Sequence, residues 1–225
     1  MTRASSIAYD TIRQLILDGV YAPGQRMLEE ELAQRVGVSR TSVRDSLRRL
    51  AGEGLVHIES SRGTFVAELE SAEIDEIFQL RAMLEGHATA LAAIHATQAD
   101  LDALSAIATE IDQLLLQTDQ PEAALFSSFQ RCNTRFHTAI LRASGSRRLQ
   151  SMSTALLELP LVTMKQHIWP GEVSVRRSNA QHWDIIEALR ARDPTLGRLR
   201  LQAHIMSTRP RAMIAQQALA TFPLL

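Results

Sequence analysis

The chain contains a single cysteine, Cys132, and a single lysine, Lys165, among its 225 residues. One cysteine excludes an intramolecular disulfide framework and a zinc site built from several thiolates. No apolar run approaches the roughly 18 residues that a helix needs to cross a bilayer. The first ten residues, MTRASSIAYD, also lack an apolar core of signal-peptide length. We therefore expect a cytoplasmic protein with no membrane partner.

Aromatic residues are scarce, at 4%, whereas alanine and leucine are abundant. This composition favours helices, and the length allows one large domain or two smaller ones. The formal net charge is −1, so no global positive field attracts nucleic acid. Any such attraction must therefore come from a local cluster of arginines.

Three short helices are predicted in the first fifty residues. The first lies in IAYDTIRQLILD and ends at Gly19, and the second lies in LEEELAQRVGV and ends at Gly37. In the second helix Leu28, Leu32 and Val36 are expected to face inward. The third helix is SRTSVRDSLRRL, residues 39–50, with Ser39 as its N-cap. Two short helices joined by VGVS have the spacing of a helix-turn-helix.

The segment GLVHIESSRGTFVAEL changes from helical to alternating periodicity, with Arg62 and Gly63 in its centre. This pattern predicts a two-stranded hairpin with a glycine at its tip. Three helices followed by a hairpin predict a winged helix-turn-helix domain over residues 1–69.

The third helix carries an arginine stripe and an apolar stripe. Arg40, Arg44 and Arg48 recur every four residues, opposite the predicted core positions. A major groove admits one α-helix, and arginine donates two hydrogen bonds to a guanine edge. Arg40 and Arg44 are the base-reading candidates, and Arg48 or Arg49 is expected to contact phosphate. The full set of candidate DNA-binding residues is Ser39, Arg40, Thr41, Ser42, Arg44, Arg48, Arg49, Arg62 and Gly63. The alternative is a solvated helix of a small helical domain.

Residues 70–225 show helical periodicity throughout, which makes the fold mainly α. Proline, glycine and capping residues separate six predicted helices, and Pro160 predicts a kink in the fourth. The predicted helices cover about 71–95, 99–117, 121–143, 146–167, 173–192 and 195–219.

Three histidines in this half are candidates for a divalent metal site, with zinc or nickel as the expected ion. Asn133 and His137 are four residues apart, on one helix face. His182 is in phase with the isoleucines and leucine that follow it, and His204 lies on the last helix. Imidazoles from three helices can converge inside a bundle. Each could instead be a core histidine.

Arg81 and Glu85 are also four residues apart. Two interpretations stay open: an ion pair on the helix surface, or an Arg81 that faces a cavity and binds the carboxylate of an effector.

The N-terminal segment GQRMLEEELAQRVGVSRTSVRDSLRRLAGEGLV and the motif RGTFV resemble the DNA-binding domain of GntR-family transcriptional regulators. The resemblance implies dimers on a short palindromic DNA operator, with DNA contacts from Arg40, Arg44 and Gly63. Family members often carry an arginine where this chain has Glu30 and Glu31.

The C-terminal half resembles the all-helical FCD effector domain, through FQLRAMLEGHATALAA, FHTAILRASGSRRL and HWDIIEALRARDPTLGRLRLQAH. This resemblance implies a metal bound by His137, His182 and His204, and a small organic-acid effector that contacts Arg81. FCD regulators commonly have aspartate at the position of Asn133, whose neutral oxygen is a weaker ligand.

The sequence thus predicts a ligand-responsive DNA-binding regulator, acting as a homodimer and not as an enzyme, with repression as its expected output. Residues 70–225 are expected to bind the effector and to dimerise. Two alternatives stay open: a metal-dependent enzyme with an accessory DNA-binding head, and a regulator whose sensor domain holds no metal.

Overall fold

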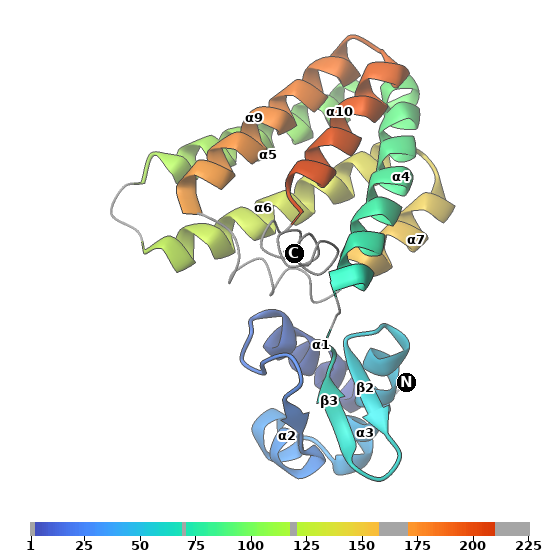
Figure 1. The fold of residues 1–225 in the computed structure, drawn as a ribbon, viewed down its shortest axis with the longest axis vertical. Helices are drawn as coiled ribbons and strands as arrows, with labels where there is room; N and C mark the ends of the chain where they lie inside the picture. Colours follow the sequence, from blue (N-terminus) through green and yellow to red (C-terminus); the bar gives the residue numbers. More distant parts are fainter. Residues whose placement is uncertain (1–2, 69–70, 118–120, 158–170, 210–225) are drawn as a thin grey trace, which may run out of the picture. The chain divides into compact units, whose positions relative to one another are not determined.

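The computed structural model describes residues 3–68, 71–117, 121–157 and 171–209, which form two compact units (Figure 1). The predicted boundary between residues 69 and 70 lies outside the described residues. The first unit is a small α/β domain and the second consists of helices, so the mainly α fold class is confirmed. Among the described residues, no helix is both long enough and apolar enough to span a membrane.

The first unit contains three helices and a small antiparallel sheet. The helices are α1 (Arg3–Leu17), α2 (Glu29–Val36) and α3 (Arg40–Gly52). The strands are β1 (Arg26–Met27), β2 (Val56–Glu59) and β3 (Gly63–Val66), in the spatial order β1-β3-β2. The predicted hairpin is confirmed, with Val56 paired to Val66 and Glu59 to Gly63. The sequence did not reveal β1, because two residues are too few to show a period.

Local signals explain where α2 and α3 begin and end. Gly37 ends α2 in the left-handed conformation, with φ 74°, which costs glycine little. The Ser39 hydroxyl caps α3 by accepting a hydrogen bond from the backbone N–H of Ser42. The prediction that Leu28 faces inward is wrong, because Leu28 precedes the first turn of α2 and is 41% exposed.

One apolar core holds this unit together. It consists of the buried faces of α1, α2 and α3 and the inner face of the sheet, and includes Ile12, Leu32, Val43, Leu47 and Leu50. Burying such a side chain contributes about 1.5–3 kcal/mol. The core fixes which side of α3 is left to solvent.

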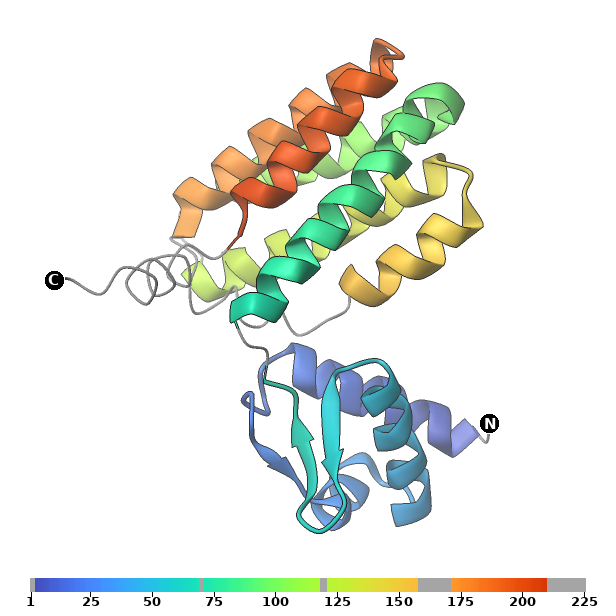
Figure 2. The ribbon, with the colours of Figure 1, turned by 45° about the vertical axis from the view of Figure 1, so that its right-hand side comes forward.

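The second unit is a helical bundle of α4 (Ser71–His95), α5 (Gln98–Leu115), α6 (Glu122–Ala143), α7 (Arg147–Leu157), α9 (Gly171–Arg190) and α10 (Pro194–Ser207). Figures 1 and 2 show α10 lying beside α4 along its length, with α9 on the other side of α10, and α5 packs against α9. Its core includes Phe78, Phe129 and Phe136.

Capping residues set several helix ends in this unit. Thr97 and Asp100 form a reciprocal capping box at the start of α5. Asp193 caps α10, and Pro194 occupies its first turn.

The last helix, α10, ends at Ser207. Its predicted continuation to residue 219 is therefore wrong at Thr208 and Arg209, which are described and are not helical. Pro210 follows in the sequence, and a residue before proline disfavours the helical conformation. The predicted kink at Pro160 lies outside the described residues.

Candidate functional site

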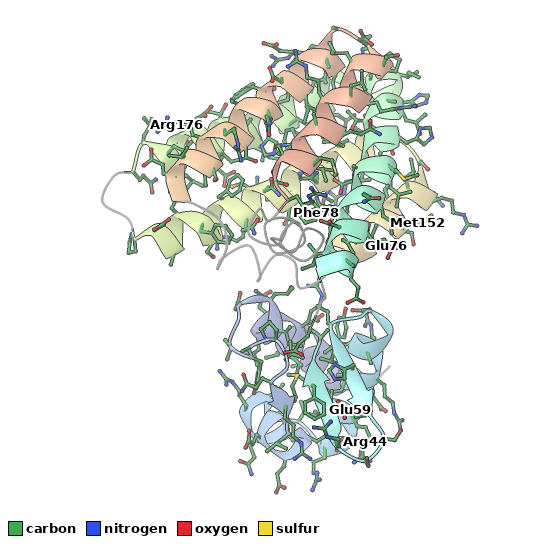
Figure 3. All side chains as sticks on the ribbon, viewed as in Figure 1. Arg44, Glu59, Glu76, Phe78, Met152 and Arg176 are labelled. Carbon is green, nitrogen blue, oxygen red and sulfur yellow. The ribbon has the colours of Figure 1, made fainter. Side chains whose placement is uncertain are left out.

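The exposed face of α3 carries the arginines that the sequence singled out. Arg40, Arg44 and Arg48 are exposed, whereas the apolar residues of the helix are buried. Figure 3 shows Arg44 at the outside of its unit. Thr41 is also exposed, but Ser42 is only 9% exposed and its hydroxyl lies 2.9 Å from that of Ser39. The two serines therefore serve the helix cap, whereas Thr41 and the arginines lie on the exposed face of α3.

Each of the four arginines of α3 lies near a carboxylate. Arg44 donates from Nε and Nη2 to the two carboxylate oxygens of Glu29, at 2.9 and 2.7 Å. The Glu29 pKa is lowered, chiefly by this hydrogen bond. The other pairs are looser or more local: Arg40–Glu30 at 3.8 Å, Arg48–Asp45 at 4.0 Å and Arg49–Glu53 at 3.1 Å. The positive field of α3 is thus partly neutralised.

Arg49 differs from its neighbours because it belongs to a packed cluster. Its guanidinium lies 3.5 Å from the centroid of the Tyr9 ring, and Tyr9 and Arg49 both donate to the carboxylate of Glu53. Burial, followed by the hydrogen bond to Glu53, raises the Tyr9 pKa to about 12. This cluster ties α3 to α1, so Arg48 is the better placed of the two residues for a phosphate contact.

The tip of the hairpin places Arg62 and Gly63 together. The Arg62 guanidinium is exposed and lies 3.0 Å from the carboxylate of Glu59. Gly63 has φ 111°, and a Cβ atom there would lie 3.2 Å from Nε of Arg26. The backbone angle therefore favours glycine here, whereas the flexible Arg26 side chain would have to shift only slightly to admit a Cβ atom.

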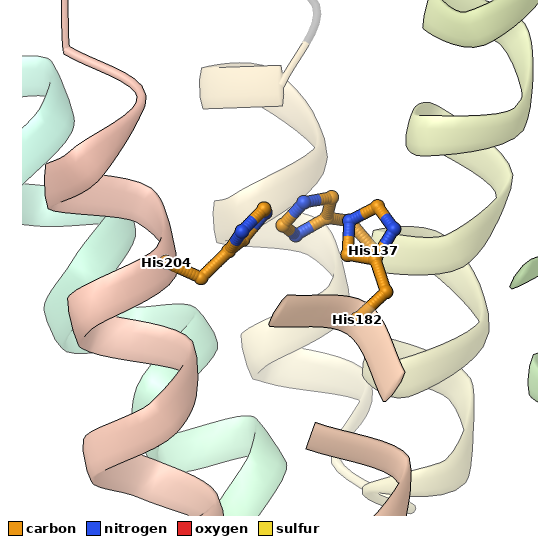
Figure 4. Close-up of side chains that lie close together, drawn as sticks. All are labelled: His137, His182 and His204. Carbon is orange, nitrogen blue, oxygen red and sulfur yellow. The ribbon is translucent and has the colours of Figure 1, made fainter. Parts of the chain in front are cut away.

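In the helical unit, His137, His182 and His204 converge from α6, α9 and α10 (Figure 4). Each histidine contributes one ring nitrogen to a group of three, and these three nitrogens all lie within 4.8 Å of one another. All three side chains are buried, with relative exposures of 2% or less. The predicted convergence of the three histidines is confirmed.

His137 is held by a buried ion pair. Its Nδ1 lies 2.5 Å from one carboxylate oxygen of Glu85, while Nε of Arg81 donates to the other oxygen at 2.8 Å. Burial by itself would raise the Glu85 pKa, but the charges and hydrogen bonds of Arg81 and His137 lower it to about 2. Glu85 is therefore ionised and fixes the ring of His137.

Arg81 and Glu85 are 6% and 1% exposed. The interpretation of this pair as a surface ion pair is therefore wrong, because α4 directs both side chains into the bundle. Nη1 and Nη2 of Arg81 make no hydrogen bond with another described residue. Two donor groups of this guanidinium are thus not used by the described part of the chain.

The other two histidines are oriented by amides. Nδ1 of His182 lies 3.4 Å from Oδ1 of Asn179, and Nδ1 of His204 lies 3.0 Å from Oε1 of Gln181. The Asn179 amide is itself fixed, since its Nδ2 donates to the Ala108 carbonyl and to Asp112. In each case the amide oxygen can accept a proton from Nδ1, and in that tautomer Nε2 carries the lone pair that can bind a metal.

The residues fit a divalent metal ion. Nε2 of His182 is buried and has no hydrogen-bond partner among the described residues, which is costly for a polar atom. Burial, with a smaller effect from His137, lowers the His182 pKa well below 6.5, so the ring is neutral. An oxygen lies near Nδ1 of each of the three imidazoles, which matches the arrangement in which hydrogen-bond acceptors orient metal-ligating histidines.

Asn133 lies one turn before His137 on α6 and is half-buried. The sequence missed Glu85, Asn179 and Gln181 as partners of the histidines. Glu85 is 52 residues from His137, and only its spacing from Arg81 marked it in the sequence. Cys132 is buried, and its thiol donates to Glu110. Burial raises the Cys132 pKa to about 11, which makes it a poor nucleophile.

Comparisons with known proteins agree with both units. The sequence model of the bacterial regulatory proteins of the gntR family matches residues 4–66, and that of the FCD domain matches residues 76–207. An uncharacterized HTH-type transcriptional regulator in an unstable DNA locus of Streptomyces ambofaciens is 31% identical over 88% of this chain and 80% of its own length.

Solved structures show the same fold. The structure of E. coli McbR/YncC has a TM-score of 0.78 and 23% identity, and the match covers 97% of this chain and 100% of that one. A solved FCD domain described as metal-free has a TM-score of 0.50 and 19% identity, over 68% of this chain and 99% of that one. The chain belongs to the gntR family of bacterial regulatory proteins, in the group that carries an FCD domain, and is a transcriptional regulator.

Proposed function

We propose that this regulator binds a palindromic DNA operator as a homodimer, with α3 of each protomer in a major groove. The observation that carries the proposal is the exposed arginine face of α3, backed by a buried apolar face. Arg40 and Arg44 lie near the start of α3, where a recognition helix contacts base edges. Arg48 contacts phosphate, and Arg62 and Gly63 reach the adjacent backbone or minor groove.

Substitution of the two base-reading arginines tests this assignment. R40A and R44A should each lose about 1–3 kcal/mol of operator binding per half-site. R176A, which removes an equally exposed arginine from the helical unit, serves as the control. Operator affinity in gel-shift titrations that is equal for all three variants would contradict the proposal.

A homodimer is supported by an apolar stripe on α4. Leu80, Met83 and Ile94 share one face of this helix and are 40%, 65% and 59% exposed. Such a stripe is a typical interface between copies of a chain. Light scattering should report a dimer for the wild type and a shift toward monomer for M83E. A wild-type monomer both free and on DNA would rule the dimer out.

We propose that His137, His182 and His204 hold one divalent ion, zinc or nickel, with the Asn133 oxygen as a weak fourth ligand or hydrogen-bond partner. The unpaired Nε2 of His182 supports this assignment. When bound, the ion would supply a Lewis-acidic centre that can accept an oxygen ligand. Elemental analysis of protein purified without chelators or a histidine tag should find one ion per chain.

The effector is proposed to be a small organic acid. Nη1 and Nη2 of Arg81 can bind a carboxylate in a bidentate manner. Two further buried hydroxyls, those of Ser178 and Ser153, have no partner among the described residues, and Ser178 lies one turn before His182 on α9. Mass spectrometry of the co-purified ligand identifies the acid. S178A should weaken its binding without loss of stability, because the hydroxyl it removes is buried and unpaired.

Effector binding at this centre is proposed to change the affinity of the dimer for its operator, with repression as the output in the cytoplasm.

A metal-free sensor is the second candidate, and the structural likeness to an FCD domain described as metal-free favours it. Substoichiometric metal that persists after zinc or nickel reconstitution would select that alternative. Turnover of a bound acid by the metal-loaded protein would instead indicate an enzyme.

A further inference from the structure

The start of α2 places two glutamates against the arginines of α3. Glu29 accepts two hydrogen bonds from Arg44, and Glu30 lies 3.8 Å from Arg40. Glu29 and Arg44 are 15 residues apart in the sequence and meet because α2 and α3 pack together. A carboxylate next to a DNA-reading arginine is unexpected on charge alone, since DNA repels it. Its role therefore has to come from what it does to the arginine.

The contact uses one edge of the Arg44 guanidinium and leaves another edge open. Glu29 accepts from Nε and Nη2. Among the described residues, no hydrogen bond uses the end-on edge, which is formed by Nη1 and the second hydrogen of Nη2 and offers a pair of donors. Arg44 is 52% exposed and Glu29 only 25%, so the guanidinium extends beyond the carboxylate that holds it. A guanine presents two acceptors, O6 and N7, which match such a donor pair.

We propose that Glu29 is a positioning residue that sets the DNA specificity of this regulator, by holding Arg44 so that its end-on edge faces a guanine. The inference rests on the proposed role of Arg44 in reading DNA. A long side chain that is already oriented loses less conformational freedom on binding. On a duplex without the matching guanine, Glu29 contributes only repulsion of phosphate. Both effects raise the affinity of the regulator for its operator relative to its affinity for other DNA.

A double-mutant cycle tests the inference, with E29Q, R44A and E29Q/R44A in the full chain. The operator probe is the duplex that the wild-type chain enriches from a random library, and the reference probe is a scrambled duplex of the same composition. E31Q is the matched control, because Glu31 is exposed in the same helical turn and has no ion pair with a described residue. E29Q and E31Q remove the same charge, so their difference reports positioning.

Relative to E31Q, E29Q should lower the ratio of operator affinity to scrambled affinity about three- to tenfold per half-site, as measured by fluorescence anisotropy. In the R44A background E29Q should lower this ratio no further. Library enrichment with E29Q should show a relaxed preference at the guanine that Arg44 reads. Thermal unfolding should be unchanged, because partly exposed ion pairs contribute little to stability.

Several results would overturn the inference. E29Q that behaves like E31Q on both duplexes would leave Glu29 with a purely electrostatic effect. A loss of specificity that persists in the R44A background would show that Glu29 acts through another residue. A lower unfolding temperature for E29Q would show that Glu29 acts through the folding of the domain. If R44A itself leaves operator affinity unchanged, the proposed reading role of Arg44 fails first and the inference fails with it.

Discussion

Replacing Glu85 with glutamine probes the buried network behind the histidines. The carboxylate accepts from Nε of Arg81 and contacts Nδ1 of His137, and it is 1% exposed. E85Q preserves the size and shape of the side chain but replaces one oxygen with an N–H₂ donor. That donor must face either the guanidinium or the imidazole N–H, so one of the two hydrogen bonds is lost. The positive charge of Arg81 then remains buried without its counter-charge.

Two magnitudes follow from this geometry. Removing one partner of a buried ion pair costs about 3–5 kcal/mol of stability. In a chain of this size 1 kcal/mol corresponds to roughly 2–4 °C in Tm, so the expected decrease is on the order of 6–20 °C. Loss of the acceptor that orients a metal-ligating histidine reduces metal affinity about 10–100-fold. Both effects should appear in the same variant.

Tryptophan fluorescence during urea denaturation measures the stability of the helical unit, because both tryptophans, Trp169 and Trp183, lie in the C-terminal half. Competition with a chromophoric chelator measures zinc affinity. E110Q is the control: Glu110 pairs with Arg135 between α5 and α6, but the two are 45% and 56% exposed. An exposed pair contributes only about 0–1 kcal/mol. Equal stability losses for E85Q and E110Q would refute the reasoning, as would unchanged zinc affinity in E85Q.

Three further predictions concern other parts of the chain. The lowered His182 pKa means that the folded state keeps this ring neutral. Its contribution to stability is therefore present above about pH 6.5 and is lost as the pH falls below that value, with a slope of at most about 1.4 kcal/mol per pH unit. Urea denaturation at pH 7.5 and 5.5 should show this loss reduced in H182F, and an unchanged pH dependence would contradict it. N133D should tighten zinc binding by adding a negative charge, whereas equal chelator-competition curves would show that Asn133 is no ligand. R48A should reduce the salt dependence of DNA binding by about one charge, as measured by salt titrations. R49A should instead destabilise the winged-helix unit by about 1 kcal/mol, because it removes the contact between Arg49 and Tyr9. Thermal melts of both variants separate this loss of stability from the effect on DNA binding.

Helical periodicity was enough to predict which side chains of a single helix are buried and which are exposed. The spacing of Val43, Leu47 and Leu50 fixed which side of α3 is buried, and hence which arginines are exposed. The phase of His182 with Ile185 directed its ring inward in the same way. These predictions succeeded because a helix places residues three and four apart on one face, whatever packs against it.

Helix ends were harder to predict. Leu28 fits the apolar spacing of α2, but it precedes the first helical turn and is exposed. The last helix ends at Ser207, although helical periodicity continues in the sequence beyond that residue. Periodicity reports the face of a helix that already exists, whereas its termini depend on the local balance of capping groups and proline.

The sequence alone determined the two-part organisation, the exposed arginines of α3 and the three inward histidines, because each depends on residues close together in the chain. Only the tertiary structure paired Arg44 with Glu29 and His137 with Glu85. Such pairs join different helices, and their geometry depends on how the helices pack and on which side chains are excluded from water. Packing also decided that Arg81 is buried, since a spacing of four residues predicts that two side chains can meet but not whether solvent reaches them.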